Sequence, residues 1–170
     1  DPRDTWDRTN GRIYRVVHGE RRMVKPFDLN GKSSAELVEL RTSPNDWYAA
    51  EARRILAERR DPSVIPGLKD RLRQDRDETI ALRDLWALHV SGGFDDSQAL
   101  ESLEHPVAGV RRWTVRFLGD DGEINQSLKS SLVALAAAES SASVRAQLAS
   151  SCQRWKAADA IPILDRLARH

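Results

Sequence analysis

Residues 47–56 have the sequence Trp-Tyr-Ala-Ala-Glu-Ala-Arg-Arg-Ile-Leu, and this stretch decides the fold because weaker copies of it return three times. The copies are Leu-Arg-Asp-Leu-Trp-Ala at 82–87, Val-Arg-Arg-Trp-Thr-Val at 110–115 and Val-Arg-Ala-Gln-Leu-Ala at 144–149. Their starts lie 35, 28 and 34 residues apart, and each begins with an apolar residue and has a small residue five places later. A period of this length predicts helical hairpins stacked one on the next.

A second motif recurs in step with the first. Ile65-Pro66-Gly67-Leu68 follows the first copy, and Ile161-Pro162-Ile163-Leu164 follows the last one. A proline in the first turn of a helix removes no hydrogen bond, because the N–H groups there have no partner within the helix. We therefore expect a partner helix after each copy, and the agreement of the two motifs supports the repeat.

The apolar periodicity and the helix boundary signals predict an all-α protein from residue 33 onward. Ser33-Ser34-Ala35-Glu36 resembles a capping box, in which the serine and glutamate side chains satisfy free backbone N–H groups. Gly92-Gly93 and Gly119 are expected to end two helices. The predicted α-α superhelix has four to five helical hairpins, built from segments at about 33–41, 45–60, 62–72, 79–90, 95–103, 107–118, 124–138, 142–155 and 160–168.

Residues 1–32 differ from the rest and predict a short β-hairpin or strand followed by a linker. Asn10-Gly11 is a strong hairpin signal, because both residues tolerate positive φ angles. The run from Arg12 to Val17 is rich in β-branched and aromatic residues, which favours a strand. A lone hairpin is marginal in water, so we expect it to pack on the helices or to complete a sheet whose remainder lies upstream.

Composition argues against several classes of function. The 27 basic and 26 acidic side chains give a net charge of +1, whereas a nucleic-acid-binding domain needs a local basic excess. Cys152 is the single cysteine, so we expect no intrachain disulfide, no multi-cysteine metal site and an inert core thiol. No apolar run is long enough to cross a bilayer, so no membrane insertion is expected. Because the sequence begins at Asp1, we expect a piece of a longer protein.

The pairing of a Val-Arg-x-x-Ala-like helix with an Ile-Pro-x-Leu-like helix resembles the HEAT repeat family over residues 33–170. Two features depart from the pattern of that family: Tyr48 stands where an arginine is expected, and the unit between Leu82 and Val110 is short. The resemblance implies a HEAT-like α-solenoid, a stack that offers an extended binding surface.

The first part of the chain is also similar to the junction in large planctomycete-type secreted proteins, often named membrane-bound dehydrogenase or haem-binding proteins. These carry a β-propeller, then HEAT-like repeats, then a c-type cytochrome domain. The similarity implies that residues 1–32 end an upstream propeller, that residues 33–170 are the HEAT-like domain, and that the protein is soluble and periplasmic or secreted. It rests on Trp6-Asp7-Arg8-Thr9-Asn10-Gly11-Arg12-Ile13-Tyr14-Arg15-Val16, Phe27-Asp28-Leu29, Ser-Ser-Ala-Glu-Leu-Val-Glu-Leu at 33–40 and Pro44-Asn45-Asp46-Trp47-Tyr48.

Neither resemblance brings a cofactor or a reaction into this chain. The haem motif Cys-x-x-Cys-His needs two cysteines, so a c-type haem is expected only elsewhere in the parent protein, as are the dehydrogenase residues. The histidines His18, His89, His105 and His170 form no pair at helical metal-ligand spacing. We therefore expect no catalytic, cofactor-binding or metal-binding residues and no enzyme activity in this segment.

Recurring arginines are the first group of candidate functional residues. Arg83, Arg111 and Arg145 occupy the second place of three of the copies. We expect them to form a structural ladder that pairs with acidic residues of adjacent units, with Asp84 and Asp120 as candidate partners. The alternative is a ladder that grips an acidic partner.

Tryptophans are the second group. Trp47 and Trp86 fall on apolar helix faces and are predicted to lie in the core. Trp113 lies off the expected inward face and is the better candidate for an exposed contact residue, because indoles are common interface anchors.

These observations predict a non-catalytic scaffold that contacts other domains of the same protein or a protein partner. The partner helices are expected to form its concave wall, with candidate interaction residues Lys69, Arg73, Glu101, Lys129 and Arg166, joined by Trp113. The alternative is a nucleic-acid-binding HEAT-like module with a basic concave face. Its nearest basic stripe, interleaved with acidic residues, consists of Arg53, Arg54, Arg59, Arg60, Arg71, Arg73 and Arg76.

Overall fold

The computed structural model of the protein describes residues 16, 18–19 and 27–169, and within them all regular secondary structure is helical. The expectation of an all-α protein is therefore confirmed for this part of the chain. The predicted β-hairpin around Asn10-Gly11 and residues 20–26 of the predicted linker lie outside the described residues.

The helices follow one another with short connections. The α-helices are α1 (Ser34–Glu39), α2 (Asp46–Arg59), α3 (Ile65–Gln74), α4 (Glu78–Val90), α5 (Asp96–Leu103), α6 (Ala108–Asp121), α7 (Gln126–Ala138), α8 (Ala142–Ser151) and α9 (Ala157–Leu167). Two short 3-10 helices, Leu40–Thr42 and Pro62–Val64, precede α2 and α3.

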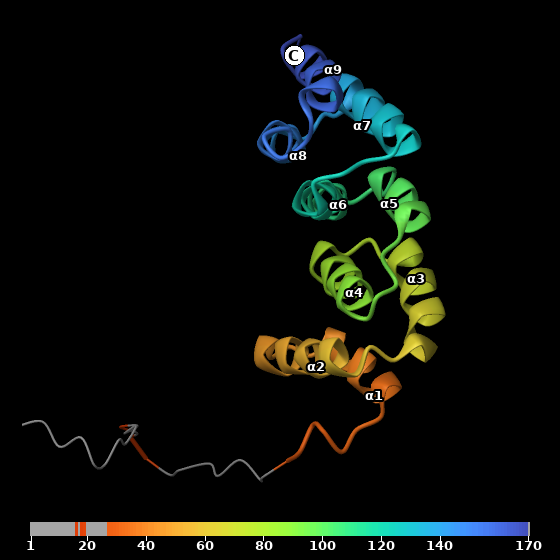
Figure 1. Ribbon diagram of the computed structural model, residues 1–170. Coiled ribbons are helices and arrows are strands. Elements are labelled where there is room, and N and C mark those ends of the chain that lie inside the picture. The colour runs from red at the N-terminus through yellow and green to blue at the C-terminus, as the bar shows by residue number, and fades with distance from the viewer. Residues whose placement is uncertain (1–15, 17, 20–26, 170) are drawn as a thin grey trace, which may run out of the picture.

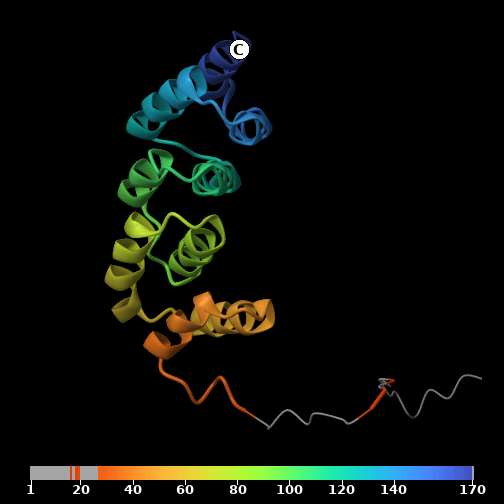
Figure 2. The same ribbon diagram turned by 180° about the vertical axis from the view of Figure 1, so that it is seen from behind.

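Two rows of helices run side by side through the molecule (Figure 1). The first row consists of α2, α4, α6 and α8, each packed on the next, and it carries the four copies of the repeated stretch. The second row consists of α3, α5, α7 and α9, which pack on the first row, while α1 packs on α2. The molecule is bent, and the second row lies on the outer side of the bend (Figures 1 and 2).

Local capping explains where several helices begin. Ser33 and Glu36 form the expected capping box at α1, with the Glu36 carboxylate accepting from the Ser33 N–H at 2.8 Å. Asp95 and Asn125 cap α5 and α7 by accepting from the N–H groups of Gln98 and Leu128, respectively.

Two predicted helix ends are wrong. The helix expected to stop at Gly119 continues to Asp121 and ends at Gly122, whose φ of 76° is the left-handed conformation that favours glycine. Gly119 serves packing instead, because a Cβ there would lie 2.6 Å from Ser151 Oγ on α8. The helix expected to reach Trp155 ends at Ser151.

The core extends along the stack between the two rows and is made of two hydrophobic clusters. The first contains Leu56, Leu68, Leu85 and other buried residues from Leu29 to Phe117. The second contains Leu132, Leu148 and other buried residues from Ala99 to Ile163. Because α6 contributes to both clusters, it joins the two parts of the core.

Trp47, expected in the core, is 53% exposed. It lies in the first turn of α2, at the end of the first row, where no further helix of the described chain covers it, and it packs edge-on against Phe27 and Tyr48. Trp86 is partly buried against the first cluster. Cys152 is buried, and burial raises the pKa of its thiol.

Among the described residues, none of the helices has the length and apolar character needed to span a membrane.

Candidate interaction site

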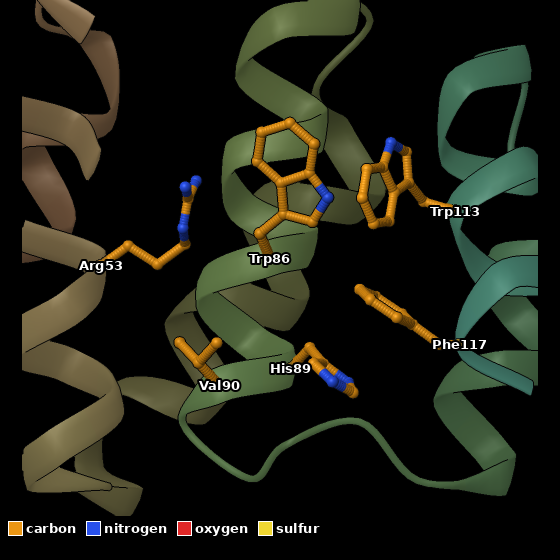
Figure 3. Close-up of a pocket in the computed structure, with 6 residues that line it drawn as sticks. All are labelled: Arg53, Trp86, His89, Val90, Trp113 and Phe117. Atoms are coloured by element: carbon orange, nitrogen blue, oxygen red, sulfur yellow. The ribbon is translucent and has the colours of Figure 1, made fainter. Parts of the chain in front are cut away.

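A pocket of about 330 Å³ opens on the first row where α2, α4 and α6 lie side by side (Figure 3). We call it the aromatic pocket. Its lining residues are Arg53 from α2, Trp86, His89 and Val90 from α4, and Trp113 and Phe117 from α6.

Helix geometry explains why aromatic side chains gather here. Trp86 and His89 are three residues apart on α4, and Trp113 and Phe117 are four apart on α6, so each pair shares one side of its helix. Because α4 packs against α6, the two pairs meet across the groove between these helices. The ring centroids of Trp86 and Trp113 are 5.1 Å apart in an edge-to-face arrangement.

A further ring contact fixes the floor of the pocket. His89 stacks on Phe117 with centroids 3.9 Å apart and planes only 6° from parallel. Burial lowers the pKa of His89, while the charge of Asp121 opposes this shift. A pKa below the ordinary value of about 6.5 leaves the imidazole mostly uncharged at pH 7, so the floor is aromatic and carries little charge.

The indole N–H of Trp86 is buried and has no hydrogen-bond acceptor in the described part of the chain. Figure 3 shows its nitrogen turned toward the Trp113 ring. An N–H group directed at an aromatic face gains a weak interaction, which gives this donor a partial substitute for a hydrogen bond. The pair thus holds the wall of the pocket in place.

Arg53 supplies the only formal charge among the six lining residues. Its guanidinium carbon lies 4.9 Å from the centroid of the Trp86 ring, a cation–π contact. Within residues 27–169 no carboxylate pairs with it, whereas its neighbour Arg54 is held by Glu51 and Glu58. Burial, and then the nearby charge of Arg83, lower the pKa of Arg53. The pocket therefore has an uncompensated positive charge on one wall.

The predicted interaction residues lie on the second row, where most are engaged within the molecule. Lys69 Nζ is 3.1 Å from Asp95, and Arg73 Nε is 2.5 Å from Glu101. Lys129 Nζ is 3.0 Å from Asp159, while Arg166 is exposed on α9. The three ion pairs connect successive helices of the second row.

The second row was expected to form a concave wall, and that expectation is wrong in the arrangement seen in Figure 1, where it lies on the outer side of the bend. The sixth predicted residue, Trp113, is partly buried in the aromatic pocket, where it packs against Trp86 and Phe117.

Two of the repeated arginines have the same local role. Arg111 Nη1 donates to the carbonyls of His105 and Pro106 at 2.7 and 3.0 Å. Arg145 Nη1 donates in the same way to the residues six and five positions before it, Glu139 and Ser140, at 2.9 and 2.8 Å. Each guanidinium thus fixes the turn that leads into its own helix.

Arg83 instead reaches the preceding unit. It donates to the carbonyls of Arg41 and Ser43 and pairs with the Asp46 carboxylate, so it joins α4 to the start of α2.

The acidic partners differ from those expected. Asp120 pairs with Arg116 and Arg154, and Asp84 pairs with Arg41. The carboxylate that receives Arg111 is Glu139, whose two oxygens each lie 2.7 Å from a guanidinium nitrogen.

Glu139 is buried and accepts a further hydrogen bond besides those from Arg111. Its side chain is 1% exposed and also accepts from the Ser141 N–H at 2.8 Å. The hydrogen bond from Arg111 is the main cause of the lowered pKa of Glu139.

Asp84 is buried in a less complete environment. Its side chain is 0% exposed, and its Oδ2 accepts a hydrogen bond from Arg41 Nε at 3.1 Å. Oδ1 of Asp84 and the buried Oδ2 of Asp75 have no hydrogen-bond partner among the described residues. Burial, aided by Asp75, raises the pKa of Asp84 to about 7. The carboxyl group is therefore partly protonated near neutral pH.

Sequence patterns gave little signal for the aromatic pocket. Arg53 and Arg54 are adjacent and chemically identical, and only the structure separates the unpaired one from the paired one. A signal for Glu139 does exist, because it is the one charged residue in the Ala-rich and Ser-rich stretch 134–143.

No group of three or more His, Cys, Asp or Glu residues suited to hold a metal ion occurs in the described part of the chain. Comparisons of this chain with protein-family models, curated proteins and solved structures find no match. Its resemblance to HEAT-containing proteins therefore rests on the sequence motifs alone.

Proposed function

We propose that residues 33–170 form a HEAT-like α-solenoid with a non-catalytic scaffold function, which binds another domain of the same protein or a protein partner. The recurring motifs and the two rows of packed helices support this reading. The aromatic pocket between α2, α4 and α6 is the binding site in this proposal.

One observation carries the proposal: within the described residues the pocket has aromatic rings and a guanidinium without a carboxylate partner, whereas most other arginines there are engaged. Tryptophan and arginine dominate the binding energy of protein interfaces, and they act best in well-packed pockets. The ring contacts of Trp86 with Trp113, and of His89 with Phe117, hold such a pocket in one geometry. A preformed pocket loses little entropy on binding.

Most arginines of the basic stripe are bonded within the molecule, and this favours protein binding over the nucleic-acid alternative. Carboxylates hold Arg54, Arg71 and Arg73, and backbone carbonyls hold Arg59 and Arg76. Binding to phosphate would require these ion pairs and hydrogen bonds to be broken and replaced. A titration with duplex DNA at low and high salt tests the alternative, because backbone binding has a steep salt dependence.

The wider setting that we propose comes from the resemblance alone. This segment links an upstream propeller to a downstream cytochrome c domain in a secreted or periplasmic redox-type protein, and it holds no cofactor itself. Sequencing of the parent gene tests this setting: propeller repeats before the segment and Cys-x-x-Cys-His after it are the expected result.

Selection from a random peptide library on the immobilised protein tests the binding function. We expect enriched peptides that bind the wild-type chain and lose affinity for Trp113→Ser, which opens the pocket. Trp47→Ser, in the first turn of α2 and outside the pocket lining, should leave binding unchanged. A selection that enriches nothing, or only peptides insensitive to Trp113→Ser, contradicts the proposed function.

A further inference from the structure

We propose that the aromatic pocket receives an acidic segment of a partner protein, which places one aromatic side chain in the pocket against the rings of Trp86 and Trp113 and a carboxylate on Arg53. This inference rests on the proposed function and specifies the chemistry of the partner.

Size and lining favour an aromatic anchor. A volume of about 330 Å³ is at the lower end of the range for small-ligand pockets, which suits one large side chain. An inserted ring would contact Trp86 and Trp113, which are partly buried and pack edge-to-face on each other. Aromatic pairs with ring centroids about 4.5–7 Å apart contribute beyond their buried area.

A cationic anchor is disfavoured by Arg53. Its guanidinium already lies over the Trp86 face, the position that a lysine or arginine of a ligand would seek. A second positive charge there would meet like-charge repulsion, and Arg83 adds to the positive field. The anchor is therefore uncharged, and the group beside it is anionic.

The positive field extends beyond the pocket across Trp113. A second cavity of about 190 Å³ adjoins this residue, and Arg112, Arg116 and Gln147 complete its lining. Arg112 is exposed, and no carboxylate of the described chain pairs with it. Among the described residues, Arg116 pairs with Asp120 alone, four residues away on the exposed side of α6, and such surface pairs contribute little to stability.

The charges that face the pocket are therefore mainly positive. Asp121 is the acidic group close enough to affect His89 at the floor, and it lies at the end of α6 away from Trp113. A peptide that crosses α6 from Arg53 toward Arg112 would meet one arginine at each end of its path. Complementary charge of this kind fixes the register of a bound segment and raises its association rate.

Desolvation strengthens the contact with Arg53. The guanidinium is half-buried and lacks an acceptor in the described chain, so a carboxylate that binds it forms a charge-assisted hydrogen bond without breaking an existing ion pair. The anchor ring simultaneously excludes water from this contact, and close charge pairs of this kind contribute strongly to affinity.

Fluorescence anisotropy with labelled synthetic peptides tests the inference. The probe is a short peptide with one tryptophan flanked by aspartate and glutamate. Its controls replace the tryptophan by alanine or the acidic residues by lysine. We expect the probe to bind, each control to bind at least about tenfold more weakly, and Arg53→Ala to weaken the probe by a similar factor. Arg54→Ala is the matched protein control and leaves affinity unchanged, because Arg54 lies outside the pocket.

A charge exchange keeps the test independent of folding defects. Arg53→Glu should lose affinity for the acidic probe and gain affinity for the lysine peptide. An unfolded variant cannot produce this reversal. Equal binding of both peptides, with sensitivity to Trp113→Ser retained, overturns the acidic chemistry and leaves the proposed function standing. Tighter binding of a single-stranded oligonucleotide than of the acidic probe overturns both.

Discussion

Two half-buried arginines of the first row, Arg111 and Arg53, are used in opposite ways. Arg111, at the junction of α6 with α8, donates to four acceptors: both oxygens of Glu139 and the carbonyls of His105 and Pro106. Arg53, at the aromatic pocket, has a tryptophan ring beneath it and no carboxylate partner in the described chain. The guanidinium at the α6–α8 junction is bonded within the molecule, whereas the guanidinium at the pocket has no carboxylate partner in the described chain.

This difference separates side chains that hold the stack together from side chains that are free to bind. A buried and fully bonded ion pair contributes to the geometry of its junction, and loss of one member leaves the other uncompensated. An unpaired arginine contributes little to the folded state, so a partner can engage it without disturbing the fold. Changes at the two sites should therefore have distinct effects on stability and on binding.

The largest expected effect follows from removal of the Glu139 carboxylate. Glu139→Ala leaves the Arg111 guanidinium without its bidentate partner and should lower the free energy of unfolding by about 3–5 kcal/mol. Urea unfolding followed by circular dichroism measures the loss. Glu58→Ala removes an exposed carboxylate of α2 and is the matched control. A loss below about 1 kcal/mol for Glu139→Ala would show that the junction does not depend on this pair.

The buried carboxyl of Asp84 provides a pH-dependent test. Its pKa of about 7 in the folded chain lies above the ordinary value of 3.8, so the folded state holds a proton that the unfolded state releases. Stability should therefore fall as the pH rises through this window and level off above about 7. Asp84→Asn cannot ionise, and relative to it the wild type should lose on the order of 2 kcal/mol between about pH 5 and about pH 8.

Glu139 should show the opposite trend, since its pKa is lowered in the folded chain. The contribution of Glu139 to stability is present above the ordinary pKa and is lost as the pH falls through the folded-state pKa.

For Asp84, parallel pH profiles of stability for the wild type and Asp84→Asn between about pH 5 and about pH 8 would contradict the raised pKa.

Close contact between α6 and α8 is a further part of the complete junction. Gly119→Ala would place a Cβ 2.6 Å from Ser151 Oγ and 3.3 Å from Ser151 Cα, so the helices must separate. We expect a loss of about 1–2 kcal/mol in thermal or urea unfolding. Gly67→Ala on α3 is the control: no atom lies within 4 Å of the new Cβ, and a gain of about 0.5–1 kcal/mol is expected from helix propensity. Equal responses of the two variants would show that α6 and α8 are not in close contact.

The smallest expected effect on stability is that of Arg53→Ala. Because this guanidinium contacts the Trp86 ring and has no carboxylate partner among the described residues, its removal should change the free energy of unfolding by no more than about 0.5–1 kcal/mol. Urea unfolding of Arg53→Ala and Glu139→Ala in parallel measures the change in the free energy of unfolding for both variants. A loss as large as that of Glu139→Ala would place Arg53 among the residues that hold the stack together.

Local patterns predicted most of the helices well, because apolar periodicity and caps act within a few residues of the chain. The placement of the prolines in a first helical turn is right for Pro66 in α3 and wrong for Pro162, which lies inside α9. Local patterns could not predict what lies against each helix. Leu68 and Leu164 occupy the same place in the repeated Ile-Pro-x-Leu motif, yet Leu68 is 0% and Leu164 41% exposed. Leu68 lies on α3, which packs against α4, whereas α9 follows the last helix of the first row and has no later described helix beside it.

The same limit applies to the functional residues. The sequence singled out Arg83, Arg111 and Arg145, but their acceptors come mostly from turns whose position depends on the packed stack. The charges predicted for an interaction surface mostly belong to ion pairs between helices of the second row. The aromatic pocket was missed because its residues come from three helices, and only packing brings Arg53 to Trp86.

The most direct test follows the indole N–H signals of the protein in a two-dimensional 15N–1H spectrum while the acidic tryptophan-containing peptide is added. Binding in the pocket should shift the signals of Trp86 and Trp113. The signal of Trp155, buried and hydrogen-bonded to the Leu118 carbonyl, and that of Trp47 should stay in place. Shifts confined to Trp47, or no shift at saturating peptide, would contradict the assignment of the pocket as the binding site.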